Sequence, residues 1–429
     1  MATRRRTGGG NAALYRKTTL RNGVRVVTEK LPSVRSISIG VWIDVGSRNE
    51  KPDESGLSHF IEHLVFKGTR SRNARQIASA LESVGGSLNA FTSREQTCFT
   101  ARVLDEFLPE AMDVLADITC RATFTPTNIN RERLVICEEI KESLDNPSDY
   151  VHDLFARTYW GKHPLGQPIM GTIDTMAAMP RARLMKFINR HYRSESIVIA
   201  ASGSISHDRL VKMVRRKFNF PEGKAEPAPP AERIDAERLV LQSDNSAQTQ
   251  FCLGFPGLAY ADQRKMAMMV LSSYLGGGMS SVLFQKIREQ RGLAYSVYAY
   301  HDFFRDSGIF GFYLGTDKKY VRKAHDLIIT ECRRLKKRRL SSNILDKVKA
   351  QLKGHLTLGM EATSNRMSRI GRQELLIGEY FTLGQAIDAI DRVTPSDVLG
   401  LARLTFDESQ IAITALGPVD KKAFADVGR

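Results

Sequence analysis

The sequence repeats itself, and this repeat limits the folds that the chain can adopt. Residues 179–203 and 394–417 each place a proline before a helical pattern, which is followed by an alternating strand pattern ending in glycine. Upstream, residues 85–118 and 294–328 each show the order strand, turn, strand, helix. Because the order and spacing match, the sequence predicts a duplicated α+β unit of roughly 200 residues.

A linker is predicted between the two copies. Residues 218–236 are rich in proline, alanine and charged residues and lack periodicity. We therefore predict a first domain over residues 14–217 and a homologous second domain over residues 237–429. Consecutive strands joined by short turns favour mainly antiparallel sheets, with helices packed on one face of each sheet.

One amphipathic helix in the first copy carries an unusual group of polar side chains. The segment SGLSHFIEHLVFKGT, residues 55–69, spaces its apolar residues as a core-facing helix does, and a glycine follows the pattern. His59 and His63 lie one helical turn apart, with Glu62 beside them. Two such histidines can bind one metal ion, and Zn²⁺ favours nitrogen ligands of this kind. A lone histidine pair also occurs on helix surfaces and in satisfied cores.

A hydrolytic zinc site needs a third protein ligand, an open position for water, and a base. Glu62 is close enough to be the base. Residues 127–147 are predicted to form a helix on which Glu132, Val135, Ile136 and Glu139 share one face. Carboxylates among apolar residues are costly unless a positive charge compensates them. We therefore expect Glu139 to be the third ligand and Glu132 to accept a hydrogen bond from a ligand histidine.

These residues give the sequence a resemblance to the pitrilysin/insulysin superfamily of inverted zinc metallopeptidases. The segment HFIEH matches the inverted motif HxxEH, and Glu139 follows His63 by 76 residues, as in that family. Segments 85–97, 163–171 and 276–297 are similar to further family blocks. The resemblance runs from about residue 15 to 417 and is strongest to the short two-domain members, which include mitochondrial processing peptidase β-subunits and bacterial peptidases.

The resemblance implies a role for each matching residue. It implies that one zinc ion per chain is held by His59, His63 and Glu139, with Glu62 as general base. It implies that Arg288 and Tyr295 bind the substrate backbone and stabilise the transition state. Asn89, Ala90 and Phe91 match a strand that pairs with an extended peptide. Since larger relatives enclose their site with four such domains, two copies of this chain are expected to form a homodimer.

The sequence thus predicts a zinc metalloendopeptidase that hydrolyses extended or unfolded peptides. The alternative is a noncatalytic scaffold subunit of the same fold, similar to the core proteins of the cytochrome bc complex. A nucleic-acid partner is suggested only by the net charge of +16, and the basic run at residues 333–339 is typical of a solvated helix end, so we expect none. Acidic side chains concentrate in residues 132–153, which predicts a preference for basic peptides.

The compartment is predicted from the cysteines and the N-terminus. The five cysteines are scattered without a CxxC pair, which is typical of thiols in a reducing compartment. Residues 1–10 are basic, but no apolar segment follows as in a secretory signal. No apolar run approaches the ~20 residues that span a bilayer. We expect a bacterial cytoplasmic protein, with the mitochondrial matrix as the alternative.

Overall fold

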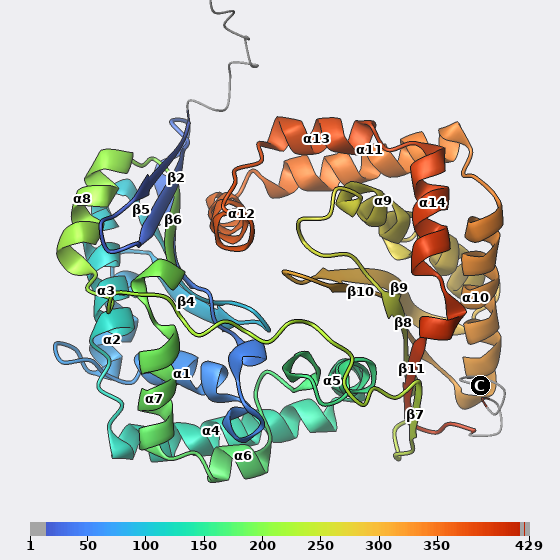
Figure 1. Ribbon diagram of the computed structural model, residues 1–429, viewed down its shortest axis with the longest axis horizontal. Helices are drawn as coiled ribbons and strands as arrows, with labels where there is room; N and C mark the ends of the chain where they lie inside the picture. Colours follow the sequence, from blue (N-terminus) through green and yellow to red (C-terminus); the bar gives the residue numbers. More distant parts are fainter. Residues whose placement is uncertain (1–13, 421–423, 425–429) are drawn as a thin grey trace, which may run out of the picture. The chain divides into compact units, whose positions relative to one another are not determined.

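The computed structural model in Figure 1 describes residues 14–420 and residue 424, so the basic N-terminal residues 1–10 lie outside the described part. The chain forms two compact units. The first unit comprises residues up to 138, 169–229 and 358–382, and the second comprises 139–168, 230–357 and 383 onward. Residues 139–168 fall within the predicted first domain but belong to the second unit, and residues 358–382 fall within the predicted second domain but belong to the first unit.

The first unit contains a six-stranded sheet in the order β1-β2-β6-β3-β5-β4. Its strands are β1 Tyr15–Thr19, β2 Arg25–Lys30, β3 Ser36–Ile43, β4 Ser87–Thr92, β5 Thr97–Leu104 and β6 Ile197–Gly203. Only β2 and β6 pair in parallel among these strands. β4 therefore lies at one edge of the sheet.

The second unit contains a five-stranded sheet in the order β7-β11-β8-β10-β9. Its strands are β7 Leu239–Gln242, β8 Thr249–Pro256, β9 Ala294–Phe303, β10 Gly308–Thr316 and β11 Ala412–Leu416. β7 and β11 pair in parallel and the other described pairs are antiparallel. The edge strand β9 corresponds in the repeat to β4.

Helices complete the two units. The first unit holds α1 Leu57–Val65, α2 Ala74–Glu82, α3 Leu108–Cys120, α6 Ile173–Ala177, α7 Arg181–His191, α8 His207–Lys217 and α12 Thr363–Leu376. The second holds α5 Pro147–Trp160, α9 Lys265–Gly276, α10 Val321–Lys337, α13 Leu383–Asp391 and α14 Pro395–Thr405. The division between the units falls inside two continuous helices, α4 Pro126–Asp145 and α11 Ser342–Gly359. None of the helices in the described part is long and apolar enough to cross a lipid bilayer.

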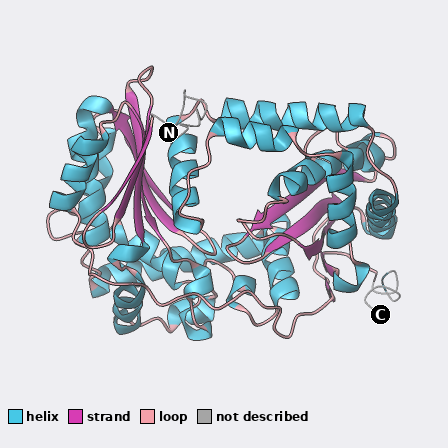
Figure 2. Ribbon diagram, turned by 45° about the horizontal axis from the view of Figure 1, so that its top comes forward, coloured by secondary structure: helices cyan, strands magenta, loops and turns pink. Residues whose placement is uncertain are grey.

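Each sheet is covered on both faces. The central strands β3 and β6 of the first sheet are almost completely buried, which requires apolar cover on both sides. In Figure 1, α3 and α8 lie on one face and α12 lies on the other. α12 contributes Met367, Ile370 and Leu375 to a core shared with that sheet. In the second unit, α5 covers one face of the sheet, and α9, α10 and α14 build the core on the other. Figure 2 shows the helices in cyan and the strands of the sheets in magenta.

The predicted α+β class with mainly antiparallel sheets is confirmed. The repeated patterns form matching elements: β4, β5 and α3 match β9, β10 and α10, while α7 and β6 match α14 and β11. Most helices lie on one face of each sheet, as expected. The opposite face of each sheet is covered by one helix from the other half of the sequence, α12 in the first unit and α5 in the second. This cover is needed because the central strands bury both of their faces.

Candidate metal centre and substrate cleft

A buried glutamate fixes the start of helix α1. The helix begins after Gly56, whose φ of 91° is a conformation that favours glycine. The carboxyl group of Glu50 accepts hydrogen bonds from the backbone N–H groups of Gly56 at 2.8 Å and Ser58 at 2.6 Å. It therefore satisfies helix-terminal donors as a capping side chain does. Complete burial raises the pKa of Glu50 to about 8.

Three predicted zinc ligands come together in the structure. His59 and His63 on α1 and Glu139 on α4 each offer one ligand atom, and these atoms lie within 4.8 Å of one another. The two imidazole rings have centroids 4.6 Å apart. Although the unit division falls within α4, Glu132 and Glu139 are carried by one uninterrupted helix. Within the described residues, this is the one group of three or more His, Cys, Asp or Glu side chains placed to hold a metal ion.

The chemistry of this group fits zinc. Two imidazole nitrogens and one carboxylate oxygen are the protein ligands of a common type of catalytic zinc site, in which the fourth position belongs to water or substrate. Burial, together with the neighbouring His63, lowers the pKa of His59 to about 4. The imidazole is therefore neutral at neutral pH, the form that binds a metal ion.

Glu132 lies next to this group. Its side chain is buried, with one carboxylate oxygen 3.5 Å from Nδ1 of His63 and the other 3.0 Å from Nζ of Lys67. A carboxylate in this position orients a ligand histidine. Val135, which the sequence placed on the same apolar face, is instead 49% exposed. The reason is that the buried face of α4 is centred on Ile136, and Val135 is rotated about 100° away from it.

Glu62 is held by Thr92, a residue outside the predicted site. One of its carboxylate oxygens accepts a hydrogen bond from Oγ1 of Thr92 at 2.5 Å. Thr92 is the last residue of β4, and the alternation of that strand places it on the half-buried face that α1 contacts. The available signal was its position directly after the predicted substrate strand.

The predicted substrate strand lies on the sheet edge. In the hairpin of β4 and β5, Ser93 N–H donates a hydrogen bond to Gln96 O. Because hydrogen-bonded and non-hydrogen-bonded residue pairs alternate along antiparallel strands, the backbone N–H and C=O groups of Asn89 and Phe91 point toward β5. The main chain of Ala90 faces the open edge, and its N–H donates to Oδ1 of Asn89 at 2.8 Å. Phe91 is 40% exposed.

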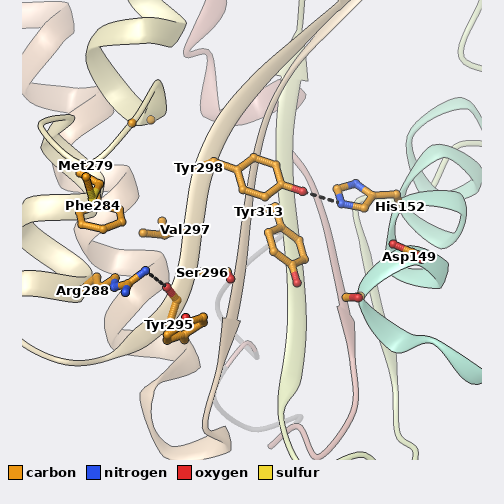
Figure 3. Close-up of a pocket in the computed structure, with 13 residues that line it drawn as sticks. Asp149, His152, Met279, Phe284, Arg288, Tyr295, Ser296, Val297, Tyr298 and Tyr313 are labelled. Atoms are coloured by element: carbon orange, nitrogen blue, oxygen red, sulfur yellow. Dashed lines mark hydrogen bonds between the residues drawn. The ribbon is translucent and has the colours of Figure 1, made fainter.

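Arg288 and Tyr295 also come together, within the second unit. Arg288 lies in the π-helical turn Phe284–Glu289, and Tyr295 lies near the start of β9. The Arg288 side chain donates from Nη1 to the carbonyl oxygen of Tyr295 at 2.8 Å, and its guanidinium carbon lies 4.4 Å from the centroid of the Tyr295 ring (Figure 3). Tyr295 is 72% exposed, so its ring is accessible to a ligand.

These two residues form part of a cleft of about 540 Å³. In Figure 3, Arg288 and Tyr295 lie at one end, Asp149 and His152 lie at the other, and Tyr298 and Tyr313 lie between them. Nε2 of His152 and the Tyr298 hydroxyl are 3.0 Å apart. Burial raises the pKa of Tyr298 to about 12, so the phenol keeps its proton. No sequence pattern singles out His152 or Tyr313, whereas Tyr298 belongs to the aromatic-rich segment AYSVYAYHDF, residues 294–303.

Two family models match this chain. The model described as insulinase (peptidase family M16) matches residues 25–173, and the model described as peptidase M16 inactive domain matches residues 178–352. An uncharacterized zinc protease of Streptomyces coelicolor is 42% identical over 417 residues, which cover 95% of this chain and 91% of the relative. An uncharacterized zinc protease of Bacillus subtilis is 41% identical over 407 residues, covering 94% and 98%.

Solved structures share the fold. A protease from Helicobacter pylori aligns with a TM-score of 0.88 at 23% identity, covering 94% of this chain and 99% of the other. A chain of complex III from Candida albicans aligns with a TM-score of 0.82 at 21% identity, covering 96% of each chain. At these identities the likeness concerns the fold alone.

Proposed function

Because this chain belongs to peptidase family M16, the insulinase family, we propose that it is a zinc-dependent endopeptidase that hydrolyses extended or unfolded peptides. The observation that carries the proposal is the approach of His59, His63 and Glu139, whose ligand atoms lie within 4.8 Å of one another. Such a set leaves a coordination position for water or substrate, as hydrolytic zinc sites require.

Glu62 acts as the base in this proposal. A zinc ion bound by the three ligands would supply Lewis acidity for the scissile carbonyl and the attacking water. Glu62 accepts the proton of the water and later delivers it to the leaving amine. Glu132 would orient His63 in this proposal by accepting a hydrogen bond from Nδ1, which lies 3.5 Å from its carboxylate.

The substrate binds as an added strand on the edge strand β4. Ala90 presents its main chain to the open edge, where a peptide carbonyl would replace Oδ1 of Asn89 as the acceptor of the Ala90 N–H. Asn89 and Phe91 contribute exposed side chains. A site of this kind selects peptides by their extended conformation, with little dependence on sequence.

Arg288 and Tyr295 complete the proposal as residues that bind the substrate backbone. Tyr295 is exposed, and the contact with Arg288 fixes both groups beside the cleft. We propose that two copies form a homodimer in which these residues serve a catalytic centre. The cytoplasmic location stays a prediction, for which the bacterial origin of both zinc-protease relatives is the support.

One competing function has a specific observation behind it. The fold likeness to a chain of complex III fits a noncatalytic scaffold subunit. The three ligand residues and Glu62, which a scaffold does not need, favour the peptidase.

The decisive experiment is to incubate the purified protein with a mixed peptide library, with and without a zinc chelator, and to sequence the products. Cleavage that stops with chelator supports the peptidase, whereas a zinc-loaded protein that cleaves nothing supports the scaffold. Glu62→Gln should retain zinc and lose hydrolysis, because the amide cannot act as a base. His59→Ala and Glu139→Ala should lose zinc. Full zinc content in His59→Ala would overturn the ligand assignment.

A further inference from the structure

We propose that Thr92 is a positioning residue for Glu62, and that it ties the orientation of this carboxylate to the strand on which the peptide docks. The inference rests on the proposed function. The Thr92 hydroxyl donates to Glu62 at 2.5 Å, within the range of about 2.5–2.7 Å for hydrogen bonds from a hydroxyl to a carboxylate. Because one carboxylate oxygen is held, rotation of the carboxyl group is restrained and the direction of its second oxygen is set with it.

Thr92 is the last residue of β4, and the hairpin of β4 and β5 fixes its backbone. Its Cα pairs with that of Thr97 on β5. Immediately after Thr92, the turn between β4 and β5 is bound to a neighbouring segment. Ser47 N–H donates to Ser93 O at 3.3 Å, and Arg48 N–H donates to Arg94 O at 2.7 Å. The backbone on both sides of Thr92 is therefore held.

A buried ion pair strengthens the turn. Nη1 of Arg48 lies 2.6 Å from a carboxylate oxygen of Glu95, and both side chains are buried. The same guanidinium donates from Nε and Nη2 to Pro229 O at 3.1 and 2.8 Å. Arg48 thus binds the turn after Thr92 to the chain that follows α8, so the threonine hydroxyl is presented by a rigid hairpin end rather than by a mobile loop.

The position of Thr92 in β4 gives separate roles to its side chain and to its main chain. Its side chain lies on the face that α1 contacts, which is where Glu62 is. Its main chain, like that of Ala90, faces the open edge, because Thr92 and Thr97 form a pair without mutual backbone hydrogen bonds. A peptide added to β4 would therefore pair with the same strand end whose hydroxyl holds the base. This links the position of the scissile bond to the orientation of Glu62.

The test compares three variants of the zinc-loaded full chain. Thr92→Val keeps the shape and removes the hydroxyl, so we expect kcat to fall by about 10- to 100-fold with KM changed less than about twofold. Thr92→Ser keeps a hydroxyl and should recover kcat to within about threefold of the wild type. Thr100→Val is the matched control. Its hydroxyl lies on the same hairpin but donates to Asn89 O at 3.3 Å, and kcat should be unchanged.

Two readouts apart from activity accompany the kinetics. Zinc content should stay at one ion per chain in every variant. In the Glu62→Gln background, which leaves the peptide intact, Thr92→Val should leave the dissociation constant of an extended peptide unchanged. If Thr92→Val does not fold by circular dichroism, Thr92→Ala replaces it with the same expectation.

Each result decides the proposal. Loss of kcat in Thr92→Val with recovery in Thr92→Ser supports it. Equal loss in the serine variant, loss of zinc, or a change confined to KM and peptide affinity overturns it while the wild-type peptidase stands. A wild-type protein that binds zinc but cleaves nothing overturns the proposed function, and the role of Thr92 falls with it.

Discussion

The Nδ1 atom of His63 lies 3.5 Å from a carboxylate oxygen of Glu132, whose other oxygen is 3.0 Å from Nζ of Lys67. Glu132 is therefore held between a cation and a candidate zinc ligand. Because a partner of this kind fixes the orientation of the imidazole and raises its basicity, its loss weakens the metal site without removing a ligand.

Glu132→Gln should lower zinc affinity by about 10- to 100-fold, because a neutral amide is a weaker acceptor than a carboxylate. Competition with a fluorescent chelator measures this affinity. Glu138→Gln changes an exposed residue of the same helix and should bind zinc as the wild type does. Equal affinity in the two variants would show that Glu132 has no part in the metal site.

The second prediction concerns stability and pH. In the folded chain, burial raises the pKa of Glu50 to about 8, compared with 4.5 for an unperturbed group. Between these values the folded state holds a proton that the unfolded state has lost. The free energy of unfolding therefore decreases as pH rises through this range and levels off above the folded pKa. From pH 7 to pH 9, the ionisation of this carboxyl group should lower the free energy of unfolding by about 1 kcal/mol.

Glu50→Gln should remove that part of the pH dependence, since the amide does not ionise and can still accept a backbone hydrogen bond. Urea unfolding at pH 7 and pH 9 with saturating zinc measures the difference. The variant Glu110→Gln, at an exposed position of α3, should keep the wild-type slope. A Glu50→Gln protein with an unchanged slope would mean that the carboxyl group is already ionised at pH 7.

Local patterns predicted the elements of this fold well, because they report which face of an element is buried. The helix carrying His59 and His63 matches α1, whose apolar stripe is completely or almost completely buried at Leu57, Phe60, Ile61, Leu64 and Val65. Such patterns do not say which sheet covers that face. The packing of α5 and α12 on sheets from the opposite halves of the sequence could therefore not be foreseen.

Some parts of the candidate site could be predicted from the sequence and others could not. The histidine pair followed from helical spacing. Glu139 was a candidate because two carboxylates share a predicted apolar helix face, and the family resemblance, with its spacing of 76 residues, supported that assignment. The contact of Thr92 with Glu62 and the cluster of His152 with Tyr298 depend on tertiary packing between separate elements. Neither contact leaves a pattern in one segment.

The third prediction concerns substrate charge. Asp149 lines the cleft, within a stretch rich in acidic side chains between residues 132 and 153. Peptides with basic side chains should be cleaved faster than acidic ones at low ionic strength, and the difference should shrink as salt screens these charges. Asp149→Asn should reduce the preference, whereas Glu142→Gln, an exposed change on α4, should alter it less. Equal rates for acidic and basic peptides at low salt would contradict this idea.

The fourth prediction is that the proposed homodimer shares its catalytic centres. A closed two-fold arrangement is the commonest form of a homodimer, and it gives both copies the same surroundings. In this arrangement, the zinc ligands and Glu62 of one chain work with Arg288 and Tyr295 of the other. Either chain alone would then hold two incomplete halves.

Subunit exchange between two inactive variants tests this arrangement. One carries Glu62→Gln, and the other carries Arg288→Ala with Tyr295→Phe. A mixed dimer contains one centre with both sets of residues intact, so random mixing should restore roughly a quarter of wild-type activity. Mixing Glu62→Gln with His59→Ala is the control, since both changes fall in the same set and no centre can recover. If exchange is demonstrated and no activity returns, the two sets act within one chain. A protein that is monomeric in solution removes the premise.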